Sequence, residues 1–141
     1  MTRIVLDAGV AAKWWLPPEP GTAEAVALFV RHAAGAVVFV VPDLFWSEVA
    51  NAFWKAAGRR RMTTDEARTA FGRLTQTQCT TVPTPPLLPQ ALDLALRHRC
   101  SVYDAVYVAT ALESGAVLVT ADEALARGLA AELPVKLLGA V

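Results

Sequence analysis

Short runs of consecutive apolar residues alternate along the chain with longer segments whose apolar positions recur every three or four residues. The apolar runs, with a weaker β-branched segment at 80–82, predict five strands at 3–6, 37–41, 80–82, 116–119 and 135–138. The periodic segments predict helices at 9–16, 21–34, 44–57, 63–78, 87–98, 101–114 and 122–131. Continuously apolar strands separated by helices indicate an α/β fold, with a parallel sheet covered by helices on both faces.

Capping residues support several of these boundaries. Thr63 and Glu66 have the spacing of a capping box, so a helix is expected to begin there. Asp43 is expected to cap the helix at 44–57, and Thr22 is a candidate cap for the helix at 21–34. Gly58 stands where the helix begun at Asp43 should end.

The length and composition predict one globular domain spanning residues 1–141. Apolar residues make up 55% of the chain and charged residues 18%, which is typical of a folded protein with a large core. No apolar run approaches the ~20 residues of a membrane span, and Asp7 interrupts the first one. We therefore expect a cytoplasmic protein with no membrane association. Cys79 and Cys100 lie far apart, which disfavours a zinc or redox motif.

The charge balance limits the nucleic-acid-binding functions that the chain is expected to have. The net charge is zero, which disfavours a protein that coats nucleic acid and leaves open an enzyme that meets RNA locally. One basic cluster comprises Arg59, Arg60, Arg61, Arg68 and Arg73. It is either a contact surface or the solvated outer side of two helices. Aromatic residues are numerous around residues 14–54, and some should remain exposed as a patch suited to a protein partner.

Two acidic residues follow predicted strands that we expect to be neighbours. Asp7 comes directly after the first strand, and Asp122 comes three residues after the fourth. If strands one to three extend in one direction and strand four lies on the other side of strand one, a topological switch point separates strands one and four. Ligands of open parallel sheets bind at such a crevice, beyond the carboxyl ends of the strands.

Two further acidic residues lie within apolar helices. Glu48 is surrounded by core-type residues on its helix, and Asp104 lies near the start of another helix. A carboxylate beside a core is costly unless it is paired or binds a metal. We term the whole set the four acids: Asp7, Glu48, Asp104 and Asp122.

Each of the four acids also has a structural explanation. Asp7 could cap the following helix, and Glu48 could be exposed. Asp104 could form a capping box with Ser101. Asp122 could be a first-turn carboxylate of a helix that Thr120 and Glu123 cap.

Taken together, the four acids indicate a metal-dependent hydrolase. No lysine or arginine lies within four residues on the same helix face of Glu48, Asp104 or Asp122 to neutralise it. Clustered carboxylates repel each other, and a hard divalent cation such as Mg²⁺ or Mn²⁺ relieves that repulsion. Such a site suits phosphodiester hydrolysis. A phosphatase or DNA nuclease using the same metal, and a non-catalytic binding module, remain alternatives.

Several segments, in this order and spacing, resemble one known family. They are residues 5–8 (VLDA), 13–19 (KWWLPPE), 44–51 (LFWSEVAN), 101–109 (SVYDAVYVA) and 118–123 (LVTADE). The sequence resembles the PIN-domain ribonucleases, specifically the VapC-type toxins of bacterial toxin–antitoxin pairs. The resemblance implies a three-layer α/β/α sandwich with a central parallel sheet.

The same resemblance implies a function and its partners. The four acids would bind Mg²⁺ or Mn²⁺, and the protein would cleave RNA as an endoribonuclease. Thr120 would support the site by hydrogen bonding, as would Asn51. A small cognate antitoxin and a second copy of the chain, in a homodimer, would be the protein partners. One position departs from the family pattern: Gly9 stands where the family often has Ser, Thr or Asn.

Overall fold

A single five-stranded parallel sheet forms the centre of the computed structural model, which describes all 141 residues. The strands are β1 (Thr2–Leu6), β2 (Val37–Pro42), β3 (Cys79–Val82), β4 (Val117–Thr120) and β5 (Val135–Leu137). Their order across the sheet is β3-β2-β1-β4-β5, with every neighbouring pair parallel. Strands β1 and β4 are therefore adjacent, and the predicted reversal of strand order lies between them.

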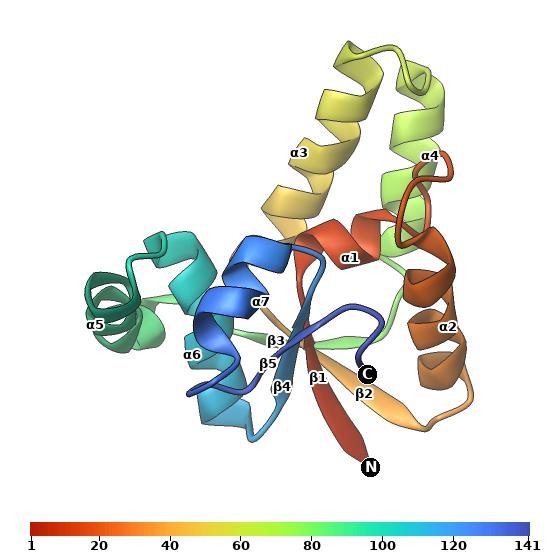
Figure 1. Ribbon diagram of the computed structural model, residues 1–141. Coiled ribbons are helices and arrows are strands. Elements are labelled where there is room, and N and C mark those ends of the chain that lie inside the picture. Colours follow the sequence, from red (N-terminus) through yellow and green to blue (C-terminus); the bar gives the residue numbers. More distant parts are fainter.

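Helices on both faces of the sheet complete the three layers (Figure 1). They are α1 (Ala8–Ala12), α2 (Thr22–Ala33), α3 (Leu44–Gly58), α4 (Thr64–Leu74), α5 (Leu88–His98), α6 (Val102–Ser114) and α7 (Glu123–Leu129), with a 3₁₀ turn, η1 (Pro85–Leu87), before α5. Helix α6 packs on β1, β2 and β4, and α5 packs outside α6. Helices α1 and α2 lie on the other side of the sheet (Figure 1). The predicted three-layer α/β/α sandwich is confirmed.

Burial on two sides explains the apolar runs that the sequence contains. Ile4, Val5 and Leu6 of β1 have no exposed surface, because helices cover both faces of this central strand. Helix α6 is buried continuously over residues 105–111, since it packs between the sheet and α5.

Helices α3 and α4 form a hairpin that projects beyond the sheet (Figure 1). The predicted capping box starts α4: the Thr63 hydroxyl accepts from the Glu66 N–H, and the Glu66 carboxylate accepts from the Thr63 N–H. Phe53 is buried in α3, whereas the adjacent Trp54 is 70% exposed. The predicted exposure of part of the aromatic set is confirmed at Trp54.

Two predicted caps are wrong. The Asp43 carboxylate does not cap α3; it accepts hydrogen bonds from the backbone N–H and the hydroxyl of Thr84, which follows β3. These hydrogen bonds lower the pKa of Asp43. Gly21, with φ 89°, precedes α2 as its cap, and the Thr22 hydroxyl instead accepts from the Glu19 N–H.

Helix α1 is shorter than the predicted segment at 9–16. It ends at Ala12, and the chain turns through residues 13–15 before Pro17. The indole N–H of Trp14 donates to the Ala25 carbonyl at 2.8 Å, which ties this turn to α2. A continued helix would move Trp14 away from that contact.

No helix combines the length and the hydrophobicity that crossing a lipid bilayer requires.

Candidate active site

The carboxyl ends of β1 and β4 form the centre of the candidate site. Leu6 pairs with Val119 at the last position of the β1–β4 register. The Asp7 N–H then donates to the Val119 carbonyl at 3.2 Å, so Asp7 is fixed directly beyond the sheet. The strand order confirms the predicted switch point between the first and fourth strands.

Thr120 links the two acids of this crevice. Its hydroxyl donates to Asp7 Oδ2 at 2.7 Å and accepts from the Asp122 N–H at 3.1 Å. The Thr120 side chain has no exposed surface. Its hydroxyl is therefore fully engaged, and it orients Asp7 relative to the segment that bears Asp122.

Asp122, and not a Thr120–Glu123 capping box, begins α7. Asp122 Oδ1 accepts from the Leu125 N–H at 3.0 Å in the usual N-cap arrangement. The Thr120 hydroxyl is used by Asp7, so it does not cap this helix. The capping explanation considered for these two residues is wrong. One Asp122 carboxylate oxygen is committed to the cap, and Oδ2 makes no hydrogen bond within the protein.

Asp104 and Glu48 come from helices packed beside the crevice. Ser101 caps α6 by accepting from the Asp104 N–H at 3.1 Å, which confirms part of the proposed capping arrangement. Glu48, in the second turn of α3, is half-buried. Its Oε1 is buried, and the Tyr107 hydroxyl lies near enough to the carboxylate to lower the pKa of Glu48. A partly buried carboxylate with no cation beside it is costly, which is a feature expected of a ligand site.

Burial and mutual repulsion raise the pKa of three of the four acids. Burial is the largest cause for Asp7; hydrogen bonds from Thr120 and from the Gly9 backbone lower its pKa, and the charges of Asp104 and Asp122 raise it by smaller amounts. Burial is also the main cause for Glu48, followed among the raising causes by the charges of Asp7 and Asp104.

Asp104 follows the same pattern, since burial raises its pKa first and the charge of Asp122 raises it further. The charge of Asp7 thus interacts with those of the other three acids, and Asp104 interacts with Glu48 and Asp122 as well.

No cationic side chain neutralises the four acids. The ion pairs of the protein join Lys13 and Arg61 to Glu19, and Arg68 to Asp65. No three carboxylate, histidine or cysteine side chains stand close enough together to hold one ion in this arrangement. Mutual repulsion keeps like charges apart, so a bound cation would have to draw the carboxylates inward.

Tyr107 is a residue of this site that the sequence did not reveal. It lies one turn after Asp104 on α6, and its buried hydroxyl lies close to the Glu48 carboxylate. Burial is the largest cause that raises its pKa, and the charges of Glu48 and Asp7 raise it further. At a helical spacing it looks like an ordinary core aromatic, and only the folded structure shows that Glu48 and Asp7 are its neighbours.

Asn51 and Gly9 lie at the margin of the site. Asn51, one turn after Glu48, is exposed and makes no side-chain hydrogen bond. At Gly9 an added Cβ would meet nothing within 4 Å. A serine would therefore fit at this position, so lack of space does not explain the glycine.

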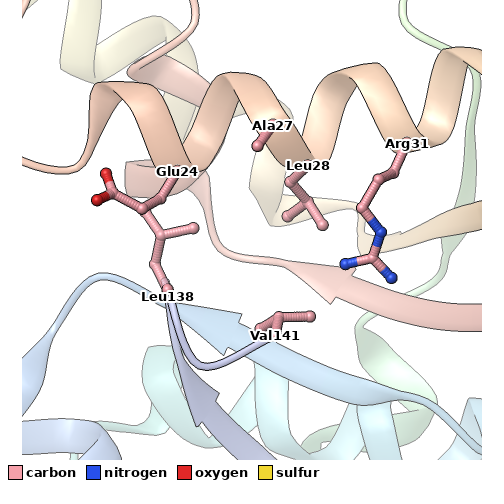
Figure 2. Close-up of a pocket in the computed structure, with 7 residues that line it drawn as sticks. Glu24, Ala27, Leu28, Arg31, Leu138 and Val141 are labelled. Atoms are coloured by element: carbon pink, nitrogen blue, oxygen red, sulfur yellow. The ribbon is translucent and has the colours of Figure 1, made fainter.

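Two cavities differ in their relation to the acids. One of about 340 Å³ is lined by Asp104 and Asp122. Another, of about 160 Å³, lies between α2 and the end of the chain, with Glu24 and Arg31 at its two ends and Leu28 and Val141 between them (Figure 2). None of the four acids lines this second cavity, so we assign it no part in the acidic site.

The sequence of this chain is similar to known proteins over most of its length. A family model described as the PIN domain matches residues 4–128. Ribonuclease VapC3 of Pyrobaculum aerophilum is 33% identical over 126 residues, which cover 88% of this chain and 92% of that protein.

Solved structures share the fold at lower identity. The crystal structure of PAE2754 from Pyrobaculum aerophilum has a TM-score of 0.72 at 23% identity, covering 99% of this chain and 85% of that one. VapBC2 from Rickettsia felis, bound to a DNA fragment from its promoter, has a TM-score of 0.66 at 10% identity, covering 96% and 98%. A toxin–antitoxin complex from Klebsiella pneumoniae has a TM-score of 0.63 at 16% identity, covering 96% of both chains.

Proposed function

Because this chain belongs to the PIN-domain family, we propose that it is a divalent-metal-dependent endoribonuclease, the toxin of a VapC-type toxin–antitoxin pair. The observation that carries the proposal is the charge repulsion that links Asp7, beyond the end of β1, to the other three acids, none of which forms an ion pair. The 33% identity to Ribonuclease VapC3 supports RNA as the substrate.

The residues present suit a hard cation. Glu48 Oε1 is a buried oxygen near the Tyr107 hydroxyl that could serve as a ligand, and the other donors are carboxylate oxygens too. Oxygen-only donor sets favour Mg²⁺ or Mn²⁺ over zinc. All four acids would hold the ion, and each would lose the repulsion that raises the pKa of Asp7, Glu48 and Asp104.

The protein's own contribution is to hold the carboxylates in place. The Thr120 hydroxyl fixes one oxygen of Asp7, and the Leu125 N–H fixes one oxygen of Asp122. Ordering of this kind around a metal site commonly contributes 10–100-fold in affinity or activity. When bound, the cation would supply the Lewis acidity that activates water and offsets charge on the phosphodiester. Asn51, exposed beside Glu48, would contact substrate or water at the edge of the site.

Exposed apolar surface supports protein partners for this toxin. Trp54 is 70% exposed on the α3–α4 hairpin, and Leu92 and Leu96 of α5 are 50% and 72% exposed. Apolar side chains exposed at neighbouring turns suit burial against another protein. We propose a small cognate antitoxin and a second copy of this chain, as a homodimer, as the occupants of these surfaces.

The substrate class is tested by parallel assays on RNA, single-stranded DNA and a phosphomonoester. With Mg²⁺ or Mn²⁺ we expect cleavage of RNA inside the chain, and excess EDTA should reduce the rate to background. Cleavage of DNA or the phosphomonoester at an equal or higher rate would contradict an RNA-specific enzyme. Absence of any hydrolysis with either metal would favour the non-catalytic binding module, the alternative that Gly9 supports.

A further inference from the structure

The cavity of about 340 Å³ lies beside Asp104 and Asp122, between α7 and the segment that joins α5 to the first turn of α6. Asp104 and Asp122 line it on the side of the four acids. His98 and Arg99 line it from the end of α5, and Leu125 and Leu129 of α7 add apolar surface. Its volume falls in the range of about 300–1,000 Å³ that is usual for small-ligand sites. The cavity therefore has the size and the mixed lining that one nucleotide would need.

Arg99 is the one arginine or lysine that lines this cavity. Two carboxylates line the same cavity, but Arg99 forms no salt bridge with either of them. All the ion pairs of the protein involve other cations. It makes no side-chain hydrogen bond either, so its guanidinium donors are free. A planar guanidinium matches two oxygens of a phosphate at once, which makes arginine well suited to phosphate recognition.

The backbone at Arg99 is of a kind that usually selects glycine. Arg99 ends α5 with φ 57° and ψ 40°, and Gly115 ends α6 with nearly the same angles, φ 60° and ψ 40°. The left-handed conformation is strained for a residue with a Cβ, and glycine adopts it freely. Apart from the glycines, Arg99 and Arg60 are the two residues with a positive φ. Arg99 thus combines a strained backbone conformation with a position in the lining of the cavity, beside Asp104 and Asp122.

We propose that this cavity binds the unpaired nucleotide next to the scissile phosphate, with Arg99 contacting the phosphate of that nucleotide. This inference rests on the proposed function and assigns it a substrate-binding subsite. The chemistry is complementary on each side: the carboxylates would hold the cation that meets the scissile phosphate, the guanidinium would meet the neighbouring phosphate, and the partly exposed Leu125 would pack on the ribose or base. A protein of zero net charge has little general attraction for RNA, so a local cation is needed.

Direct binding tests the subsite without cleavage. In the Asp7→Asn background, an RNA oligonucleotide that the active protein cleaves is titrated at several salt concentrations, with fluorescence anisotropy as the readout. Arg99→Gln should weaken binding about tenfold and reduce the slope of log K against log salt by about 0.7, the value for one phosphate contact on single-stranded RNA. Arg97→Gln, on the same helix but outside the cavity, is the matched control and should bind as its parent does.

Kinetics and a modified substrate locate the contact. In the active protein, Arg99→Gln should raise KM about tenfold and leave kcat within about twofold. A neutral methylphosphonate at one of the two linkages beside the cleaved bond should weaken binding about tenfold for the parent protein and have little effect for Arg99→Gln. Arg99→Gly, which suits the backbone, should lose RNA binding equally while melting at the same or a higher temperature.

Two results would overturn the subsite. One is equal RNA binding by Arg99→Gln and the parent protein; the other is an equal loss for Arg99→Gln and Arg97→Gln. In either case RNA cleavage by the active protein would leave the proposed function standing. If the active protein cleaves no RNA, the proposed function fails, and the subsite fails with it.

Discussion

Replacing Asp104 with asparagine is expected to reduce RNA cleavage by about 100- to 1,000-fold while the protein still folds. The change keeps the shape of the side chain and removes a negative charge from the metal site, where electrostatic contributions commonly amount to 10²–10³ in rate. Burial and the charge of Asp122 already raise the pKa of Asp104, so loss of the charge should not destabilise the fold. Initial cleavage rates and circular dichroism measure the two effects.

A matched control separates the site from net charge. Asp65→Asn on α4 removes the same charge from an exposed residue that pairs only with Arg68. Surface ion pairs of this kind contribute about 0–1 kcal/mol, so its activity should remain within about twofold of the unmodified protein. Asp104→Asn retaining a tenth or more of the activity would contradict the assigned role.

Asp7→Asn is expected to abolish cleavage and to stabilise the metal-free protein at pH 7. An asparagine carbonyl still accepts from the Thr120 hydroxyl, so the 2.7 Å hydrogen bond is retained in kind. The buried charge and its repulsion from Asp104 and Asp122 are lost. A gain of about 1–2 kcal/mol, or about 3–10 °C in Tm for a chain of this size, is the expected order of magnitude.

The pH dependence of that gain follows from the direction of the pKa shift. Burial raises the pKa of Asp7 in the folded state above the unfolded value of about 3.9, so the folded protein binds the proton more tightly. Stability of the metal-free protein therefore falls as the pH rises through the raised pKa. The Tm difference between Asp7→Asn and the unmodified protein should be small near pH 4 and reach its full value above the raised pKa.

Melting curves in EDTA between pH 4 and pH 8 measure this difference. Adding Mg²⁺ should raise the Tm of the unmodified protein by mass action and leave Asp7→Asn nearly unchanged. A destabilised Asp7→Asn protein at pH 7 in EDTA would show that the carboxylate is not strained in the metal-free state.

Local sequence patterns predicted the fold because burial of the strands is nearly complete. Ile4 to Leu6 are buried on both sides, which requires an unbroken apolar run and leaves no polar alternation. The reversal of strand order was an assumption. If the first and fourth strands are neighbours, Asp7 and Asp122, which follow them, lie at the same crevice. The family resemblance supplied the three-layer arrangement and the supporting role of Thr120.

The partner of each hydrogen bond in the site could not be predicted, because residues distant in sequence decide it. Thr120 and Asp122 both have the spacing of a helix cap, and the bond from Thr120 to Asp7, 113 residues away, assigns the cap to Asp122. In the same way Thr84, 41 residues away, engages the Asp43 carboxylate in place of the expected cap. Tyr107 has the helical spacing of a core residue, and its proximity to Glu48, 59 positions earlier, depends on the tertiary fold.

Binding of Mn²⁺, followed by calorimetry, tests most directly whether the four acids share one divalent cation. The unmodified protein is compared with the single amide variants Asp7→Asn, Glu48→Gln, Asp104→Asn and Asp122→Asn, and with Asp65→Asn as the control. We expect each of the four amide variants to bind Mn²⁺ at least about tenfold more weakly, and the control to bind it normally. Absence of Mn²⁺ binding by the unmodified protein, or unchanged binding by the four amide variants, would contradict the shared site.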